Sequence, residues 1–244
     1  MARRRTVITS ASNPRLKLIR KLASRHQRDK LGLFVCEGED LVAAGLDAEL
    51  EPVEALIDVD RPALAERLPR AELVAPELMA EVSTLPHPAR VVAVFRRADL
   101  PAGTDAPVGL ALWHVGDPGN IGTLLRAADA LGPAFVALSA GCADPTGPKA
   151  LRASAGAVFR VPVGRFDGAP APLVALVPRA PRALWDLELG ERTTFVLGAE
   201  REGLPGDVLA RCDETVSIPL AEDSDSLNVA MAGTIALYEA KRRA

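Results

Sequence analysis

The stretch HVGDPGNIGTLLRAADALG, at positions 114–132, combines a tight turn with a cation that a helix would leave open. Asp-Pro-Gly-Asn favours a turn, because Pro fixes φ while Gly and Asn tolerate unusual backbone angles. Apolar residues then recur at helical spacing, with Asn120 at the expected N-cap and Gly132 at the expected end of the helix. Arg126 points roughly 150° away from the apolar stripe. Gly122, one turn earlier, has no side chain to cover it, so we predict an exposed guanidinium.

Two later stretches also carry polar residues where a predicted strand ends. FVLGAEREGLP, at 195–205, runs from a strand into Gly198 and on to Glu200. SIPLAEDSDSLNVAMAGTIALYEAKRR, at 217–243, leaves a strand, crosses an acidic loop and opens a helix at Ser226-Leu227-Asn228. Parallel sheets often bind ligands beyond the carboxyl ends of their strands, so three such ends together favour one ligand site.

Each stretch also has a purely structural interpretation. Asn120 and Ser226 would be N-caps, Gly198 a turn residue and Arg126 a solvated arginine. The joint occurrence of three polar strand ends favours the functional interpretation. The last helix is built on small residues, which allow close backbone approach in a dimer interface or a tightly threaded core; they are Ala230, Ala232, Gly233 and Ala236.

Composition indicates an ordinary globular protein of one large or two modest domains, with 244 residues, 48% hydrophobic and 25% charged. Three cysteines far apart indicate reduced thiols, and we expect a cytoplasmic protein. The three isolated histidines predict no metal site. No apolar run approaches ~18 residues, which argues against a membrane span. The basic start MARRRTVITSASNP has no apolar core and is no secretory signal.

The net charge of −3 conceals a strong asymmetry. Residues 1–30 carry ten Lys and Arg against one Asp, a net charge of +9, whereas residues 37–60 carry nine Asp and Glu without Lys or Arg. A basic block of this density suggests a polyanion partner, most often a nucleic acid. The alternative is a solvated basic helix.

The chain divides into two α/β parts. Helix-like and strand-like pieces alternate from 13 to 97, starting with a predicted helix at 13–26, and this alternation implies a small α/β layer. A stretch rich in Pro, Gly and Asp follows, so we assign domains to 1–100 and 109–244 with a linker at 101–108. The second part contains near-continuous apolar strands, which predict a parallel sheet covered on both faces. They are expected at 109–115, 134–139, 158–163, 173–177, 193–198 and 215–220.

The three stretches resemble the three motifs of the SpoU (TrmH) family, in the SPOUT superfamily of RNA methyltransferases. The matches are DPGNIGTLLRAADALG, FVLGAEREGL and IPLAEDSDSLNVAMAGTIALYEA. GPKALRASAGAVFRVPV, at 147–163, resembles the segment between the first two motifs. Residues 6–97 resemble the substrate-binding domain of many members, mainly through RKLASRHQRDKLGLFVCEGEDLV. Ala199 replaces a frequent Asn and Leu220 a frequent Met, and both positions tolerate small or apolar residues.

The resemblance implies an α/β architecture of two domains. The N-terminal domain would be a small α/β RNA binder similar to ribosomal protein L30e. The C-terminal domain would be an α/β-knot domain with a parallel sheet and a deep trefoil knot, and it would form the homodimer. Its knotted loops would hold S-adenosylmethionine in a bent shape without a metal, which agrees with the absence of a Gly-x-Gly-x-x-Gly motif. The matching donor-site positions are Leu197, Gly198, Ile218, Leu220 and Leu227.

The acceptor that the resemblance implies is a ribose 2′-hydroxyl of RNA, a group that must be positioned and deprotonated. Arg126 matches the arginine that the family assigns to the acceptor, where it would clamp a phosphate or act as general base. Its intrinsic pKa above 12 favours the clamp. Asn120 would brace the loop, Glu200 would orient Arg126 or the substrate, and Ser226 and Asn228 would complete the pocket.

The resemblance does not identify which RNA is the substrate as narrowly as it identifies the reaction. Members with this N-terminal domain often modify large-subunit ribosomal RNA, so 23S ribosomal RNA is the first expectation and transfer RNA the second. A non-catalytic RNA-binding or assembly factor is an alternative that the intact motif residues disfavour, and a DNA-binding regulator would need a helix-turn-helix pattern. The basic block supplies the predicted RNA contacts, which are Arg15, Lys21, Arg25 and Arg28.

Overall fold

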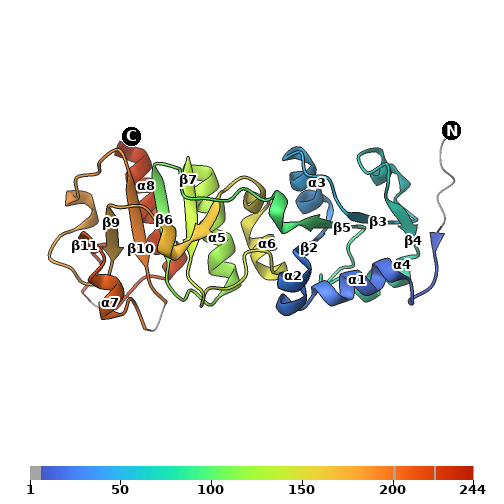
Figure 1. The fold of residues 1–244 in the computed structure, drawn as a ribbon, viewed down its shortest axis with the longest axis horizontal. Coiled ribbons are helices and arrows are strands. Elements are labelled where there is room, and N and C mark those ends of the chain that lie inside the picture. Colours follow the sequence, from blue (N-terminus) through green and yellow to red (C-terminus); the bar gives the residue numbers. More distant parts are fainter. Residues whose placement is uncertain (1–6, 200–201, 223, 244) are drawn as a thin grey trace.

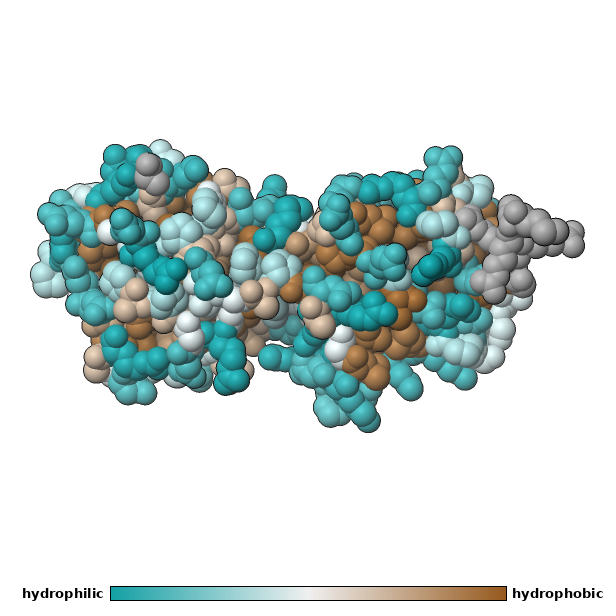
Figure 2. Space-filling model, turned by 45° about the horizontal axis from the view of Figure 1, so that its top comes forward, coloured by the Kyte–Doolittle hydropathy of each residue, from teal (hydrophilic) through white to brown (hydrophobic). Residues whose placement is uncertain are grey.

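The computed structural model describes residues 7–199, 202–222 and 224–243, and the chain forms two lobes along one axis (Figure 1). Figure 2 shows a narrower waist between the lobes. The N-terminal lobe contains a five-stranded sheet in the order β1-β4-β3-β5-β2. β3, β4 and β1 run parallel, while β5 is antiparallel to both of its neighbours. The strands are β1 (Val7–Ile8), β2 (Leu33–Glu37), β3 (Glu54–Asp58), β4 (Glu72–Val74) and β5 (Val91–Arg96).

The predicted helix at 13–26 is two helices. Asn13 caps the first one, because its side chain accepts a hydrogen bond from the Arg15 backbone N–H and Pro14 occupies the first turn. The chain breaks at Ala23 and Ser24, and Gly32, with φ of 64°, ends the second helix. The helices of this lobe are α1 (Pro14–Leu22), α2 (Arg25–Leu31), α3 (Glu39–Asp47) and α4 (Pro76–Val82), with 3-10 turns at Pro62–Glu66 and Arg97–Asp99.

The C-terminal lobe confirms the predicted parallel sheet. Its six strands lie in the order β11-β9-β10-β6-β7-β8, and every pair of neighbours is parallel. The strand expected at 158–163 is wrong: a 3-10 turn occupies Ala157–Phe159, and the strand starts only at Val163. The strands are β6 (Val108–Leu112), β7 (Ala134–Leu138), β8 (Val163–Arg165), β9 (Leu173–Leu176), β10 (Thr193–Leu197) and β11 (Glu214–Val216).

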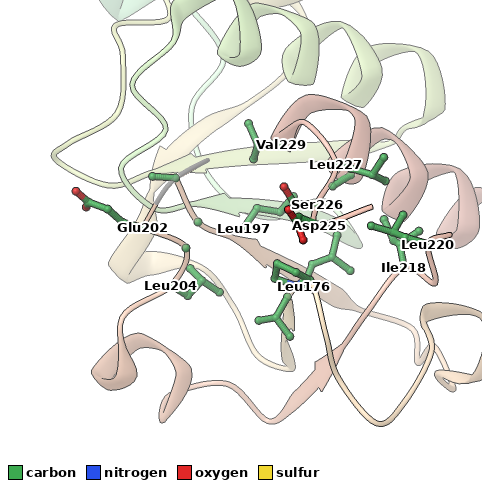
Figure 3. Close-up of a pocket in the computed structure, with 16 residues that line it drawn as sticks. Leu176, Leu197, Glu202, Leu204, Ile218, Leu220, Asp225, Ser226, Leu227 and Val229 are labelled. Carbon is green, nitrogen blue, oxygen red and sulfur yellow. The ribbon is translucent and has the colours of Figure 1, made fainter. Parts of the chain in front are cut away.

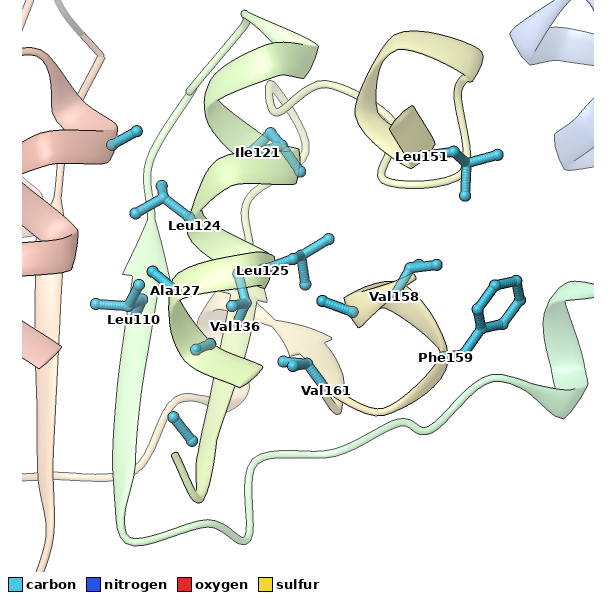
Figure 4. Close-up of a cluster of buried hydrophobic side chains, with 14 of the residues drawn as sticks. Leu110, Ile121, Leu124, Leu125, Ala127, Val136, Leu151, Val158, Phe159 and Val161 are labelled. Carbon is cyan, nitrogen blue, oxygen red and sulfur yellow. The ribbon is translucent and has the colours of Figure 1, made fainter. Parts of the chain in front are cut away.

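Helices cover both faces of this sheet. Figure 4 shows one face, where Ile121, Leu124 and Leu125 of α5 (Pro118–Leu131) point toward the strands and toward α6 (Pro148–Ser154). α8 (Val229–Arg243) packs beside α5, and the opposite face carries α7 (Gly206–Leu209). A Cβ at Gly233 would overlap the Leu124 side chain, so the small residues of α8 serve close packing inside the lobe.

The two lobes share a hydrophobic core. Phe159 of the C-terminal lobe packs edge-on against Phe95, with ring centroids 5.6 Å apart, and also lies near Phe34. The segment predicted as a linker is ordered, because Val163 donates a hydrogen bond to the Pro101 carbonyl and β6 already starts at Val108. The lobes are therefore packed against each other as well as joined by the chain.

A buried ion cluster fastens the lobes. The Asp144 carboxylate, 8% exposed, accepts hydrogen bonds from Arg28 Nε at 2.8 Å and Arg97 Nη2 at 2.6 Å. Arg28 is 5% exposed and also donates to the carbonyls of Leu22 and Ala23. Because its guanidinium faces inward, the prediction that Arg28 contacts RNA phosphate is corrected: it is an interlobe residue.

We predict that Asp144→Ala lowers the free energy of unfolding by about 3 kcal/mol, because it leaves two arginines without their buried partner. The control is Asp47→Ala, which removes an exposed ion pair with Arg67 and should cost less than about 1 kcal/mol. Urea unfolding of both variants measures the difference. Equal effects would show that the cluster does not hold the lobes together.

The same carboxylate should give a pH dependence. Burial raises the pKa of Asp144, but hydrogen bonds from Thr146 and Arg28 and the charge of Arg97 outweigh burial and leave it below its usual value. A lowered pKa contributes stability above the unfolded-state pKa of about 3.9 that is lost as pH falls through the folded-state value. The stability gap between native protein and Asp144→Ala should therefore narrow below about pH 4.

Candidate functional site

The turn before α5 is capped by Asp117 and not by Asn120, which corrects the predicted N-cap. Asp117 Oδ1 accepts from the Asn120 backbone N–H at 3.0 Å, and Oδ2 accepts from Lys149 Nζ at 2.6 Å. The hydrogen bond from Lys149 is the main cause that lowers the pKa of Asp117. Because Asp117 takes the cap, the Asn120 side chain in the first turn is left for other contacts.

Asn120 meets Asn228, 108 residues later in the chain. Asn228 Nδ2 donates to Asn120 Oδ1 at 3.2 Å. The side-chain amide oxygen of Asn228, Oδ1, accepts hydrogen bonds from the backbone N–H groups of Ala230 and Met231, at 2.9 and 3.3 Å. One side chain therefore starts α8 and ties it to the start of α5.

A cavity of about 420 Å³ lies where β9 and β10 end and α8 begins (Figure 3). Its wall comes from three separated segments of the chain. It includes all five residues expected at the donor site and also Ser226; they are Leu197, Gly198, Ile218, Leu220, Leu227 and Ser226. The structure thus brings these residues together.

Two glycines shape the backbone at this cavity. A Cβ at Gly198 would overlap the carbonyl of Gly203, and Gly203 itself has φ of 66°. The Gly203 backbone N–H donates to the Ala199 carbonyl at 2.9 Å. Only glycine allows the chain to return this closely. Gly198 therefore serves both as a turn residue and as part of the cavity wall.

The lining of the cavity is apolar with acidic exceptions. Glu202 and Asp225 line it, and the described part of the lining contains no Lys or Arg. Sequence reasoning missed three lining residues at the end of β9, which are its last residue Leu176 and the following Val177 and Pro178. The signal that could have found them is the apolar strand end at 173–177, but the order of strands that places β9 beside β10 is not readable from the sequence.

Arg126 is exposed on α5, as predicted, and forms no ion pair within the described ranges of the chain. It does not line the cavity among the described lining residues. Gly122 has a different role from the predicted one: a Cβ there would overlap the Ala150 carbonyl, so Gly122 accommodates α6. Glu200 lies outside the described residues.

A shallower hollow of about 330 Å³ lies between α5 and α8, and Asn120 and Asn228 line it. Its outer rim is the solvent-facing side of α8, where Met231 and Tyr238 are each 57% exposed and Ile235 37%. The Asn120–Asn228 pair therefore lies in this hollow, beside an apolar outer face of α8.

Of the predicted RNA contacts besides Arg28, Lys21 is exposed and Arg25 is mostly exposed while donating to the Cys142 carbonyl. Arg15 forms ion pairs with two carboxylates, from Nε to Glu54 Oε2 at 2.7 Å and from Nη2 to Glu72 Oε1 at 3.6 Å. The described residues contain no cluster of three or more metal-ligating side chains. Within the same ranges, every helix is too short or too polar to span a bilayer.

Comparisons with known proteins match both lobes. Residues 107–238 match the SpoU rRNA Methylase family, and residues 13–93 match the MRM3-like substrate binding domain. The chain is 31% identical to the 23S rRNA (guanosine(2553)-2'-O)-methyltransferase RlmP of Bacillus subtilis over 95% of this chain and 97% of that protein. It is also 31% identical to the 23S rRNA (uridine(2479)-2'-O)-methyltransferase of Streptomyces viridochromogenes, over 91% and 87%.

The fold agrees with a solved methyltransferase structure. The AdoMet-bound rRNA methyltransferase from Sinorhizobium meliloti superposes with a TM-score of 0.85 at 27% identity, covering 98% of each chain. The parallel α/β sheet with a cavity at its carboxyl edge is therefore shared with a solved rRNA methyltransferase. The chain belongs to the SpoU rRNA methylase family.

We predict that Asn228→Ala lowers the free energy of unfolding by about 1 kcal/mol, because it removes the side-chain cap of α8. Asn228→Asp is the matched variant: it keeps an acceptor for the helix but cannot donate to Asn120 Oδ1. It should change stability by less than about 0.5 kcal/mol. Urea unfolding compares the two, and a native value for Asn228→Ala would contradict the capping role.

Proposed function

We propose that the protein is an S-adenosylmethionine-dependent RNA methyltransferase that modifies a ribose 2′-hydroxyl, most specifically in 23S ribosomal RNA. The observation that carries this proposal is the cavity that gathers residues of the second and third motifs, together with the Asn228–Asn120 hydrogen bond that brings the first motif to the start of α8. The names of the Bacillus and Streptomyces relatives support the ribosomal substrate.

The cavity fits the methyl donor. Its volume of about 420 Å³ is within the range of small-molecule sites. Apolar side chains such as Leu197 and Leu227 suit an adenine ring, while Glu202 and Asp225 suit the positive sulfonium and ammonium groups. Bound there, S-adenosylmethionine supplies a methyl group whose departure leaves a neutral thioether. The Sinorhizobium structure, described as AdoMet-bound, supports this assignment.

The acceptor side belongs to α5 and the start of α8. Arg126 is open to solvent and would hold the phosphate next to the target ribose through its planar fork. Its intrinsic pKa above 12 makes it a poor general base. Asn120 and Asn228 brace the two helix starts, Ser226 lines the cavity, and Glu200 is proposed to orient Arg126 or the substrate.

We further propose a homodimer through the C-terminal lobe. The outward face of α8 presents Met231, Ile235 and Tyr238, and their exposure on one helix supports a protein contact. A deep trefoil knot in this lobe and an L30e-like N-terminal lobe are also proposed, as the family resemblance implies. We propose a cytoplasmic location, in keeping with the free cysteines.

The Arg126 series tests the function on 23S ribosomal RNA. Arg126→Lys keeps the charge but loses the fork, so methyl transfer should fall by about 10–100-fold, from a loss of roughly 1.5–3 kcal/mol. Arg126→Ala should be slower still. Single-turnover transfer of labelled methyl groups, with the modified ribose mapped, measures the rate, and calorimetry should find donor affinity unchanged.

A pH series separates the two roles of Arg126. If it takes the proton, Arg126→Lys should partly retain activity, with a rate that rises between pH 7 and 10, since Lys has the lower intrinsic pKa. A clamp predicts no such rise. A native rate of methyl transfer by Arg126→Ala would contradict both the clamp and the general-base role. Methylation of transfer RNA but not of 23S ribosomal RNA would identify transfer RNA as the substrate.

The exposed lysines of α1 should carry RNA affinity. Lys17→Gln combined with Lys21→Gln should flatten the dependence of log K on log salt by about 0.7 for each RNA phosphate that the protein no longer neutralises. The matched double variant is Arg61→Gln with Arg70→Gln, exposed residues of the 59–71 segment, which packs on the other face of the sheet from α1. Anisotropy titrations measure both slopes. An unchanged slope for the lysine pair would make this block only a solvated face.

A further inference from the structure

The backbone is strained just after the carboxyl end of β6. His114 has φ of 52°, in the left-handed region that residues with a side chain rarely adopt. Its backbone N–H donates to Ser139 Oγ at 2.9 Å, so the loop after β7 helps to hold this conformation. Strain of this kind persists only where the surrounding structure enforces it, and it is concentrated at binding and catalytic sites. Neither the proposed donor site nor the proposed acceptor residues include His114.

The imidazole of His114 is held in one orientation. It stacks on the Trp113 indole, with ring centroids 4.7 Å apart and 5° between the ring planes. Trp113 is itself packed edge-on against Phe166, with ring centroids 5.1 Å apart. A Cβ at Gly141 would lie 2.6 Å from Cδ2 and 2.7 Å from Cγ of the imidazole, so glycine is needed there to leave room for the ring.

This support surrounds a side chain that faces solvent. His114 is exposed, and within the described ranges of the chain neither of its ring nitrogens forms a hydrogen bond. A histidine that only covered the surface would need neither a strained backbone nor a stacking partner and a glycine against its ring. Together these features fix the direction of a hydrogen-bonding edge before a ligand arrives, which reduces the entropy lost on binding.

The order of the strands places His114 between the donor cavity and the N-terminal lobe. Figure 1 shows β9, β10, β6 and β7 side by side, with α2 of the other lobe beyond them. Leu176 and Leu197, the last residues of β9 and β10, line the cavity. The Trp113 backbone N–H donates to the Leu197 carbonyl at 2.8 Å, so His114 follows on the neighbouring strand. Neighbouring strands are about 4.8 Å apart, which puts His114 at the same edge of the sheet as the cavity.

Beyond β6, the same edge continues to the N-terminal lobe. The loop after β7 includes Cys142, whose carbonyl accepts from Arg25 Nη1 of α2 at 3.1 Å. Lys149 of α6 also lies at this edge, because its Nζ binds Asp117 in the turn after β6. Both cations have a carboxylate neighbour, Asp29 for Arg25 and Asp117 for Lys149, but their side chains are 54% and 59% exposed. An RNA strand that contacts α2 and reaches the donor cavity would therefore cross the end of β6.

We propose that the His114 imidazole donates a hydrogen bond from a ring N–H to a phosphate of the RNA substrate, on the strand that leads from the N-terminal lobe to the target ribose. The inference rests on the proposed function in that the ligand is RNA. The exposed cations nearby favour a phosphate, and phosphate contacts fix the register of a nucleic acid on a protein. A neutral imidazole already carries one N–H donor and a protonated one carries two, so the contact forms in either state.

His114→Gly removes the imidazole at a position whose backbone suits glycine. The full-length variant should bind 23S ribosomal RNA about tenfold more weakly than the native protein, a difference equivalent to 1.4 kcal/mol. Filter binding at fixed salt measures the affinity. The urea unfolding midpoint should stay close to native, because relief of the strain offsets the added freedom of the unfolded chain. Native RNA affinity in this variant overturns the proposal.

Ala155→Gly is the matched control for the change in backbone. Ala155 is exposed and has φ of 47°, so glycine relieves the same kind of strain there without removing a hydrogen-bonding side chain. This variant should bind RNA with native affinity. A loss equal to that of His114→Gly would overturn the role of the imidazole.

Gly141→Ala tests the orientation of the ring without changing His114. The added Cβ displaces the imidazole, so RNA affinity should fall by at least about threefold, equivalent to roughly 0.7 kcal/mol. Gly190→Ala is the matched control, because the nearest atom to its Cβ would be the Arg192 carbonyl oxygen at 3.9 Å. Gly190 lies with Thr193 of β10 at the opposite edge of the sheet. Native affinity in Gly141→Ala would overturn the proposed contact by an oriented ring.

Ribose methylation of 23S ribosomal RNA by the same proteins separates this inference from the proposed function. His114→Gly should need more RNA for the half-maximal single-turnover rate, while the rate at saturating RNA and the donor affinity stay native. Methylation by the native protein, with unchanged RNA affinity in His114→Gly, refutes the phosphate contact alone. Weaker RNA binding by His114→Gly, with no methylation by the native protein, refutes the catalytic proposal and keeps the contact. A lower rate at saturating RNA with native RNA affinity would assign His114 to the chemical step and overturn the proposal.

Discussion

Helix α5 is held between two helices at separations that only glycine permits, and the rest of the structure depends on this packing. Gly122 lets the backbone of α6 approach on one side, and Gly233 of α8 receives Leu124 on the other. The helix that carries Asn120 and Arg126 therefore has little freedom to shift. A side chain at either glycine would push apart elements that the site needs together, because a close-packed interior does not absorb added volume cheaply.

This packing connects the site to the lobe interface. α8 begins at the Asn228–Asn120 hydrogen bond and borders the donor cavity. On the other side, α6 follows the loop that holds Asp144 and precedes the turn that packs Phe159 against Phe34 and Phe95. Helix α5, to which we assign the acceptor, thus lies between the proposed donor cavity and the lobe that we propose binds RNA. The orientation of that lobe is set by buried contacts, and the ordered 101–108 segment adds to them.

Sequence patterns predicted the features that depend on neighbouring residues. The apolar strands predicted the parallel sheet, and the spacing of Ile121, Leu124 and Leu125 predicted the inward face of α5. These patterns could not predict contacts between residues that lie far apart in the sequence. Arg28 looked like an RNA contact because Asp144, its partner, is 116 residues away. Both Asp117 and Asn120 can cap a helix, and only the observed hydrogen bond decides between them. The order of strands, which assembles the cavity, has no local signature.

The basic block shows that ion pairs within the fold reduce the number of cations that remain available to a ligand. In the described part of the block, residues 7–30, three arginines pair with carboxylates: Arg15 lies beside Glu54, Arg20 beside Glu81 and Arg28 beside Asp144. The planar guanidinium can donate two parallel hydrogen bonds to one carboxylate, so arginine suits intramolecular ion pairs better than lysine does. Lysine is a strongly hydrated point charge, and Lys17, Lys21 and Lys30 stay exposed. Within residues 7–30, the cations that remain unpaired for a polyanion are therefore mainly lysines, while Arg15, Arg20 and Arg28 stabilise the surface that presents them.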